Sequence, residues 1–379
     1  MAEAGGSPSS PEGRQDKYAK YRGCLLGGAV GDALGAPVEF LGREAITERF
    51  GPEGITDFAA AYGRIGAITD DTQLTLFTAE GLIRSYVRLS LKGITTEVGV
   101  TAHAYLRWLL TQGEQPHHHF DFLDEEKGWL FGQPQLHHRR APGTTCLSAL
   151  QGMRSLAEQA DNDSKGCGGV MRVAPAGLFA ATVSPEGRVD ETFQLGADLC
   201  AITHGHPSGT LAGGTFAALI LELARGATLR EALPEAKRVL VQHRGHEETL
   251  AALDSAERLA SSEVDPHRAI VKLGEGWVAE EALAISVYCA LVAEDFRHGV
   301  ILAVNHDGDS DSTGSITGNL LGVSHGVEAI PEAWLAELEL RNIIEEIADD
   351  LCDFTDWPID GFGDEDGLVD RIWHKYPGF

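Results

Sequence analysis

Hydrophobic positions recur every three or four residues along most of the chain, which is the spacing of one face of an α-helix. After Thr69, for example, Leu76, Ala79, Ile83 and Tyr86 follow this spacing. Similar patterns predict helices over 94–112, 147–156, 190–202, 210–225, 228–260, 279–293 and 334–351. Long strands with alternating polar and apolar residues are scarce, and no internal repeat stands out. We therefore expect an all-α fold, formed as a compact multi-helix single domain.

Local composition indicates how the chain is organised. Residues 1–16 are rich in Gly, Ser and Pro with almost nothing to bury, so a disordered tail is expected there and the single domain over residues 17–379. Residues 42–68 are predicted to be loop-like. Residues 113–143 are predicted to be a polar, partly exposed insertion, whose adjacent histidines cannot all face one ion, and residues 353–379 a loop-rich end.

Glycine recurs every fourth residue near the start of the expected domain, at Gly23, Gly27, Gly31 and Gly35. This spacing lines one helix face with hydrogen atoms, so another backbone can approach closely. Neither a Walker A loop nor a G-x-G-x-x-G turn is present here. Asp32 and Glu39 lie in the same region among apolar residues, and such acids usually have a partner or a task.

Composition narrows the class of protein. The 379 residues are 43% hydrophobic, enough for a large core. The net charge of −27 argues against binding of an anionic membrane, or of nucleic acid except as a modified substrate. A phosphate-bearing substrate would need local donors or a bridging metal. The six cysteines form no C-x-x-C pair, no apolar stretch approaches 18 residues and no leader is recognisable, so we expect a cytoplasmic protein.

The most informative segment is 299–322. It passes from an apolar run, 300–304, through Asp307, Asp309 and Asp311 into a small-residue helix predicted over 315–321. Three carboxylates within five residues repel one another unless a cation or solvent neutralises them. Because both flanks are apolar, we predict a buried divalent-metal site rather than a solvated turn.

Two familiar aspartate motifs can be compared with this segment. An EF-hand loop read from Asp307 fails, because Ser312 and Gly318 stand where Gly and a bidentate Glu are needed. The nucleophile loop of a haloacid-dehalogenase-type phosphatase fits better. That fold needs a parallel sheet after the motif, and too few residues remain, so this activity is a minor alternative.

A second pair of acids begins the helix expected after residue 68. Thr69 stands at the N-cap position, and Asp70 and Asp71 occupy the first turn. Acidic first turns also occur without any site, because they complement the helix dipole. The acids at 309 and 311 likewise precede a helix. Two such starts brought face to face could supply a cluster of about six oxygen ligands for a hard cation.

Residues 165–178 form the third informative segment. Gly166, Gly168 and Gly169 expose backbone N–H groups that could cradle phosphate oxygens, although an ordinary glycine turn explains them as well. His204 lies in the break between two expected helices. It could donate to a phosphate or a hydroxyl, or it could merely cap a helix.

Taken in order, the motifs GCLLGGAVGDALGAPVEF, TDDT, KGCGGVMRVAP, THGHPSG and GDSDSTGSITGNLLG resemble those of the ADP-ribosylglycohydrolase family. That family contains dinitrogenase-reductase-activating glycohydrolases and ADP-ribosyl-arginine and ADP-ribosyl-serine hydrolases. The resemblance implies an all-α fold with two Mg²⁺ or Mn²⁺ ions, a binuclear site at the bottom of a cleft. By motif match, the metal ligands would be Thr69, Asp70, Asp71, Asp309, Asp311 and Ser312.

The resemblance also implies roles in catalysis. Glu39 matches an acid beside the metals that orients or deprotonates water, and Asp70 and Asp311 would take part in catalysis. The metals would bind the ribose diol and a water, while the glycosidic bond breaks through an oxocarbenium-like state. By the same motif match, the substrate-binding residues would be Lys165, Gly166, Cys167, Gly168, Gly169, Met171 and His204.

Details of the motifs bear on the substrate. At Cys167 many relatives carry Asn. The Asp-Ser-Asp-Ser form of the last motif favours the arginine-specific relatives, whereas Gly-Asp-Ala-Leu-Gly favours the nitrogenase-regulating ones. We first expect a hydrolase that acts on ADP-ribosylated protein, or on a small ADP-ribosyl compound, cleaves an arginine linkage and releases ADP-ribose. Serine- or nucleobase-linked substrates and a catalytically silent ADP-ribose-binding protein are the alternatives.

Overall fold

The computed structural model describes residues 11–124, 128–156, 158–359 and 367–378. Within them, the only strands form a two-residue antiparallel hairpin, Ala60–Ala61 (β1) with Arg64–Ile65 (β2). The expected all-α fold is therefore confirmed. The phosphatase alternative is wrong, because the described residues form no parallel sheet and the apolar run before the Asp loop is a helix.

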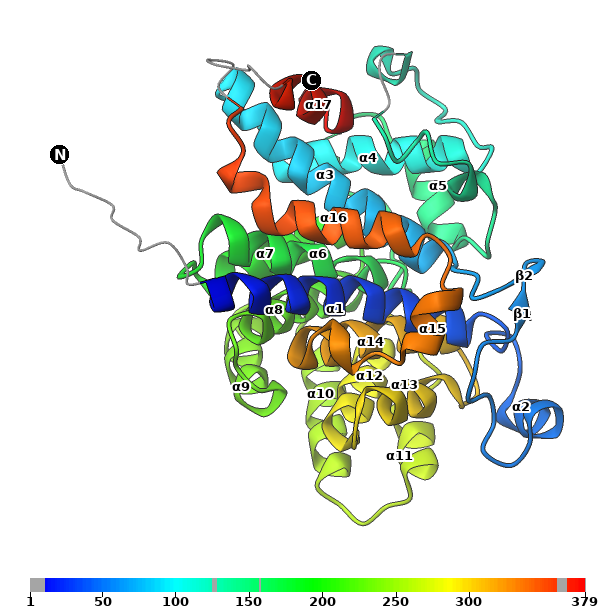
Figure 1. The fold of residues 1–379 in the computed structure, drawn as a ribbon. Coiled ribbons are helices and arrows are strands. Elements are labelled where there is room, and N and C mark those ends of the chain that lie inside the picture. Colours follow the sequence, from blue (N-terminus) through cyan, green and yellow to red (C-terminus); the bar gives the residue numbers. More distant parts are fainter. Residues whose placement is uncertain (1–10, 125–127, 157, 360–366, 379) are drawn as a thin grey trace.

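Seventeen α-helices account for most of the described residues (Figure 1). In chain order they are α1 (Pro11–Gly35), α2 (Arg43–Phe50), α3 (Asp70–Lys92), α4 (Glu97–Thr111), α5 (Thr144–Gly152), α6 (Ala174–Val183), α7 (Val189–Ala201), α8 (Pro207–Ala224), α9 (Leu229–Leu240), α10 (Glu247–Ala260), α11 (Pro266–Leu273), α12 (Ala279–Val292), α13 (Phe296–Val304), α14 (Ser310–His325), α15 (Glu332–Glu337), α16 (Arg341–Asp353) and α17 (Leu368–Lys375). Short 3-10 turns are η1 (Asp121–Asp124), η2 (Pro134–His137), η3 (Val170–Arg172), η4 (Val327–Ala329) and η5 (Phe354–Asp356).

Helices α1 and α14 lie antiparallel and side by side near the centre of the fold (Figure 1). Their backbones touch because glycine faces glycine along both helices. A Cβ atom added to Gly23, Gly27 or Gly31 would lie 2.2, 2.4 or 2.0 Å from the carbonyl oxygen of Gly322, Gly318 or Gly314, respectively. The close helix approach predicted from the four-residue glycine spacing is confirmed.

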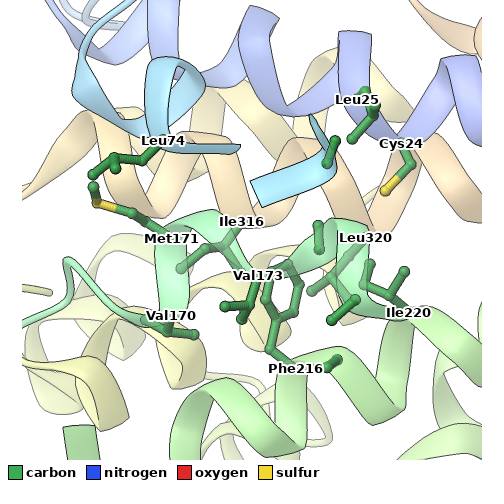
Figure 2. Close-up of a cluster of buried hydrophobic side chains, with 14 of the residues drawn as sticks. Cys24, Leu25, Leu74, Val170, Met171, Val173, Phe216, Ile220, Ile316 and Leu320 are labelled. Carbon is green, nitrogen blue, oxygen red and sulfur yellow. The ribbon is translucent and has the colours of Figure 1, made fainter. Parts of the chain in front are cut away.

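An apolar core beside this pair joins the segments that carry the candidate site. Figure 2 shows buried side chains from α1, α3, α8, α14 and the segment 170–173 meeting in one cluster. The labelled residues are Cys24, Leu25, Leu74, Val170, Met171, Val173, Phe216, Ile220, Ile316 and Leu320. Close packing of this cluster fixes the directions of α3 and α14 relative to each other.

Several predicted boundaries are wrong. Helix α14 begins at Ser310 rather than at 315. Residues 11–16, expected in the disordered tail, belong to α1, whose Lys17 donates to the Cys352 carbonyl oxygen at 2.8 Å. Residues 1–10 lie outside the described part. The start of this helix is stabilised by contacts with a distant segment, such as that between Lys17 and Cys352. Hydrophobic periodicity cannot predict such contacts.

Other corrections concern segments expected to be uniform. The loop expected over 42–68 contains α2 and the hairpin. The helix over 228–260 is interrupted between α9 and α10, and the helix over 334–351 is interrupted at Leu340, which has a φ of +59°. The end expected to be loop-rich contains α17, while residues 360–366 and 379 lie outside the described part.

The segment 113–143 has mixed character in the structure. Its paired and tripled histidines are exposed, and η1 and η2 are its regular elements. Residues 125–127 lie outside the described part. Arg140 is buried, and the segment ends against the start of α3. Among the described helices, none has the length and apolar character needed to span a membrane.

Candidate active site

The first acidic segment is the N-terminus of α3. Thr69 is its N-cap, as predicted, and the Thr69 hydroxyl oxygen accepts a hydrogen bond from the amide of Asp71 at 3.3 Å. Asp70 and Asp71 lie in the first turn and are buried. The helix dipole favours negative charge at this end. The local fold therefore holds two carboxylates close together inside the protein.

Asp32 of α1 supports this helix start from outside. Its fully buried carboxylate accepts hydrogen bonds from the amides of Thr69, at 3.0 Å to each oxygen, and of Thr72, at 3.1 Å. The Thr72 hydroxyl donates to it as well. These amides belong to the first turn, where the helix itself offers no acceptors. Asp32 therefore acts as a second cap supplied by another helix.

Residues 140–143 provide another anchor for α3. The amide of Asp70 donates to the carbonyl oxygen of Arg140, and the amide of Gly143 donates to Asp70 Oδ2, both at 3.2 Å. The Arg140 guanidinium pairs with both carboxylate oxygens of buried Glu339, at 3.0 and 3.2 Å, and donates to the Ile68 carbonyl oxygen at 2.9 Å. The end of the expected insertion therefore positions Asp70.

The second acidic segment, the N-terminus of α14, is capped from within. Asp309 is the N-cap, and its carboxylate accepts from the amide of Ser312 at 3.3 Å. Asp311 accepts from the same amide at 3.0 Å. Gly308 precedes them with a φ of +132°, and a Cβ atom there would lie 1.9 Å from the Glu275 carbonyl oxygen. The turn into α14 therefore requires glycine.

The structure brings the two helix starts together. Burial, followed by the negative charge of Asp311, raises the pKa of Asp70 and that of Asp71. The Thr69 side chain lies near enough to Asp311 to counteract part of the rise that burial causes in the pKa of Asp311. Burial and the same Asp311 charge raise the pKa of Glu39, which lies just beyond α1. Acids from three segments distant in the sequence therefore share one buried site.

In the part of the chain that the structure describes, no positive side chain forms an ion pair with these acids. The ion pairs found within the described residues involve other carboxylates, even where the pair is buried. Asp71 Oδ1 and Glu39 Oε2 are buried without a hydrogen-bond partner. An unpaired buried carboxylate costs several kcal/mol, so the cluster needs protons or cations. The set comprises Asp32, Glu39, Asp70, Asp71, Asp309 and Asp311, and we call it the acid cluster.

Asp307, the remaining acid of the loop, does not join the acid cluster. It is exposed, and its Oδ1 accepts a hydrogen bond from the amide of Arg43 at 2.7 Å. It therefore caps the start of α2. Of the three alternating aspartates in the sequence, only Asp309 and Asp311 point inward.

The chemistry of the acid cluster fits a hard divalent cation, although the side chains do not form a finished cage. Among the described residues, no three or more His, Cys, Asp or Glu side chains are arranged to hold a metal ion. Mg²⁺, however, commonly uses one or two carboxylates together with waters and substrate oxygens. The hydroxyls of Thr69 and Ser312 add neutral oxygen donors here. Two unpartnered carboxylate oxygens within an uncompensated cluster are what such an ion requires.

The glycine segment, which we define as residues 165–171, lies against the start of α14. Cys167 Sγ donates to Asp309 Oδ2 at 2.7 Å, and the Ser312 hydroxyl donates to the same sulfur at 3.7 Å. A thiol of this segment therefore supplies a donor to the acid cluster. We find no acceptor for the amides of Gly168 and Gly169 among the described residues. Two N–H groups near the acid cluster thus have no protein acceptor among the described residues; Gly168 is half-buried and Gly169 is buried.

Two residues predicted to bind substrate have other contacts in the structure. Lys165 forms ion pairs with Glu248, at 2.9 Å, and with Glu280, so its charge is already matched. Met171 is buried in the core cluster of Figure 2, where its sulfur lies 3.8 Å from the Ser312 hydroxyl. The contacts of Lys165 and Met171 stabilise the glycine segment. That either residue binds substrate stays a prediction.

His204 packs its ring against the glycine segment. A Cβ atom on Gly166 or Gly168 would lie 3.4 or 3.5 Å from His204 Nε2, so these glycines allow the ring to approach. Nδ1 lies 2.8 Å from the Thr203 hydroxyl. Burial, with a smaller contribution from the Arg172 charge, lowers the pKa of His204 to about 3. The ring is therefore neutral near pH 7.

An exposed aromatic surface adjoins the acid cluster. Phe40, next to Glu39, is 72% exposed and stacks on Trp277, which is 39% exposed, with ring centroids 6.0 Å apart. The Trp277 carbonyl oxygen accepts from the amide of Cys167 at 3.1 Å. This surface therefore connects the acid cluster, through Phe40, with the glycine segment, through Trp277. The sequence pattern did not predict it.

Sequence reasoning missed several residues that hold the site. Arg172 and Asp32 are both charged residues inside an apolar run. On this ground Asp32 is identified as a candidate from the sequence, but Arg172 is not. Arg140 and Glu339 offer no such signal, because 199 residues separate them and neither lies in a recognisable motif. The role of Thr203 cannot be predicted from the sequence, because it depends on contacts with Arg172 and His204 that only the structure shows.

Comparisons with known proteins yield a consistent set of likenesses. A family model described as ADP-ribosylglycohydrolase matches residues 13–358. The chain is 28% identical to the ADP-ribosyl-[dinitrogen reductase] glycohydrolase of Rhodospirillum rubrum, over 84% of this chain and 90% of that protein. It is 24% identical to the ADP-ribosylarginine hydrolase Tri1 of Pseudomonas putida, over 88% of this chain and 78% of that protein. A solved structure named ADP-ribosylglycohydrolase-related protein complex matches with a TM-score of 0.59 and 26% identity, covering 90% of this chain and 99% of that chain.

Proposed function

Since the chain belongs to the ADP-ribosylglycohydrolase family and is a glycosidic-bond hydrolase, we propose that it releases ADP-ribose from modified arginine side chains of proteins with the help of divalent metal ions. The main support is the buried acid cluster, which has no ion-pair partner among the described residues and lies next to a glycine segment with two amides that lack a protein acceptor there. Arginine is favoured because one relative is named an ADP-ribosylarginine hydrolase. A guanidinium group is also a cation, which a negative site attracts.

In this proposal the glycine segment binds the diphosphate of the substrate. The amides of Gly168 and Gly169 and the neutral ring of His204 are local donors for phosphate oxygens. Such donors are needed because the net charge of −27 repels anions from the protein as a whole. The ribose at the far end of the diphosphate would then lie over the acid cluster.

The acid cluster acts on the ribose. A bond forms between a water oxygen and the anomeric carbon, and the bond from that carbon to the guanidine nitrogen breaks, with its electron pair leaving on nitrogen. We assign the role of base to Glu39, because its Oε2 has no hydrogen-bond partner and can accept the water proton. That proton ends on the departing guanidine. Nearby carboxylates stabilise the positive charge of the oxocarbenium-like state.

Metal ions would be held by oxygen atoms at the two helix starts, those of Thr69, Asp70, Asp71, Asp309, Asp311 and Ser312. When bound, divalent cations supply the charge that keeps these carboxylates ionised, orient the ribose hydroxyls and lower the pKa of the attacking water.

Hydrolysis of matched peptides tests the proposal. The protein is incubated with ADP-ribosyl-arginine and ADP-ribosyl-serine peptides, with and without Mg²⁺, and free ADP-ribose is measured. We expect release from the arginine peptide only when Mg²⁺ is present. Preferential release from the serine peptide would reassign the linkage. Release from neither peptide, together with tight ADP-ribose binding, would identify a silent binding protein.

Variants of the Asp loop locate the activity. Asp311→Ala and Asp309→Asn should abolish turnover while thermal unfolding stays close to that of the wild type, since asparagine also serves as an N-cap. Asp307→Asn is the matched control, because it lies in the same loop and is exposed. It should keep wild-type turnover. Full activity of Asp311→Ala would remove the mechanism.

A further inference from the structure

Arg172 is a fully buried cation without a carboxylate partner among the described residues. Its guanidinium lies over the Tyr105 ring, 4.3 Å from the centroid, and its Nε has no hydrogen-bond partner. Burying an unpaired charge is costly. Such a residue is therefore expected to act on something nearby. Its polar contacts lead to the two parts of the predicted phosphate site, His204 and the glycine segment.

The first contact leads to His204 through Thr203. Arg172 Nη2 donates to the Thr203 hydroxyl oxygen at 2.6 Å, and this oxygen lies 2.8 Å from His204 Nδ1. Among the described residues, the other carbonyl oxygen in reach of the hydroxyl proton is that of Cys200, at 3.5 Å. That carbonyl already accepts the amides of Thr203 and His204, both at 3.0 Å. The hydroxyl therefore donates to Nδ1, because the shorter bond has a free acceptor.

This assignment fixes the tautomer of His204. A neutral imidazole carries one proton, so a ring that accepts at Nδ1 carries its proton on Nε2. Nε2 is the ring atom nearest to Gly166, and the Cε1–Nε2 edge of the ring faces Gly168. The ring therefore presents a donor toward the glycine segment. The opposite tautomer would present a lone pair, which repels a phosphate oxygen.

The second contact leads to the glycine segment itself. Arg172 Nη1 lies 3.4 Å from Cys146 Sγ, and this sulfur lies 3.7 Å from the Gly168 carbonyl oxygen. A Cβ atom on Gly168 would approach Cys146 Sγ to 2.8 Å, so segment and thiol are in close contact. One buried guanidinium thus supports both the histidine and the loop.

We propose that Arg172 is a positioning residue of the phosphate site: through the Thr203 hydroxyl it holds His204 as the Nε2–H tautomer, so that the ring donates to the diphosphate of the substrate. This inference rests on the proposed function for the identity of the ligand. The relay from Arg172 to Nδ1 rests on the geometry alone.

NMR of the wild-type protein tests the relay without any ligand. Ring ¹⁵N labelling distinguishes the Nδ1–H and Nε2–H forms, and His204→Gln identifies which of the signals belongs to His204. We expect a neutral Nε2–H ring at pH 7. A Nδ1–H ring would overturn the inference, even if the enzyme were active.

A pair of Thr203 variants tests the consequence for binding. Thr203→Val removes the hydroxyl at nearly constant shape and should weaken ADP-ribose binding roughly 10- to 100-fold, with loss of the single tautomer. Thr203→Ser restores the hydroxyl and should restore both. Wild-type affinity in a folded Thr203→Val protein would overturn the inference. If Thr203→Val does not fold, the wild-type spectrum and Thr203→Ser decide it.

The proposed function and the relay can be refuted by different experiments. Absence of ADP-ribose binding by the wild type, measured by calorimetry, would count against the proposed function and the ligand assigned to this site. The tautomer spectrum would still decide whether the Thr203 hydroxyl donates to His204 Nδ1, which is the step of the relay next to the ring.

Discussion

The starts of α3 and α14 carry aspartates to the same acid cluster, yet they are held by different means. The first turn of α3 is bound by polar groups from other segments, namely Asp32, Arg140 and Gly143. The first turn of α14 caps itself through Asp309, and the helix is held by backbone contact with α1. Polar anchors fix a few atoms, whereas backbone packing fixes a whole helix.

Adjacent residues of α1 serve the two starts. Gly31 faces the backbone of Gly314 on α14, and Asp32 accepts from the first turn of α3. Helix α1 therefore sets the register of both helices relative to each other. A substitution at Gly31 should unfold the protein, while a substitution at Asp32 should displace carboxylates within a folded protein. Paired substitutions at these positions can test this difference directly.

The largest effect is expected for Gly31→Ala. A Cβ atom there would lie 2.0 Å from the Gly314 carbonyl oxygen, and neither backbone can move without disturbing the remaining glycine contacts. We expect the free energy of unfolding to fall by about 3 kcal/mol or more, or folded protein to be lost. Urea denaturation followed by circular dichroism measures it. Gly152→Ala is the control, because nothing lies within 4 Å of a Cβ at that helical glycine, and a similar loss there would refute the packing argument.

A smaller effect on stability, but a clear one on turnover, is expected for Asp32→Asn. The amide group keeps the shape but turns an N–H donor toward the donors of Thr69 and Thr72, so the first turn of α3 shifts. A displacement of about 1 Å at a reacting centre can cost about 100-fold in rate. We therefore expect turnover of the arginine peptide to fall by about 100-fold while α1 and α14 stay packed.

Asp16→Asn is the matched control for Asp32→Asn, because Asp16 lies on the same helix and its side chain, which pairs with Lys20, is 64% exposed. It should leave turnover unchanged. Equal turnover of Asp32→Asn and the wild type would mean that the polar anchor does not position the catalytic carboxylates. Loss of folded Asp32→Asn protein would instead place Asp32 with Gly31 as a determinant of the fold.

The same contrast explains what the sequence could predict. The glycine spacing on α1, the Thr69 cap and the acids of both helix starts are local patterns, so the helices, their close approach and the candidate acids could be predicted. Which acid caps which helix could not. Asp307 and Asp309 look alike in sequence, but one caps α2 at the surface and the other caps α14 inside. That choice depends on the path of the chain through Gly308 and on contacts with Glu275.

Long-range polar anchors are the part that local patterns do not contain. The pairing of Arg140 with Glu339 joins a segment predicted to be a polar insertion to a residue between two helices. Propensity and periodicity describe neighbours within a few turns, and these partners are 199 residues apart. The roles of the acids in metal binding and catalysis, in contrast, came from the family resemblance and stay predictions.

The smallest of the expected effects is for Glu339→Gln, which weakens the second anchor of α3. Glu339 is 2% exposed, and besides Arg140 it accepts the amide of Ile68 at 3.2 Å, so the neutral side chain leaves donors without full partners. We expect a loss of about 2 kcal/mol in the free energy of unfolding and a smaller loss of turnover than in Asp32→Asn, because Asp32 still holds the first turn. The control is Glu332→Gln, whose ion pair with Arg341 is exposed and should contribute little. If the Glu339→Gln and Glu332→Gln proteins unfold at the same urea concentration, the start of α3 depends on Asp32 alone. The comparison between the helix starts would then reduce to the two adjacent residues of α1.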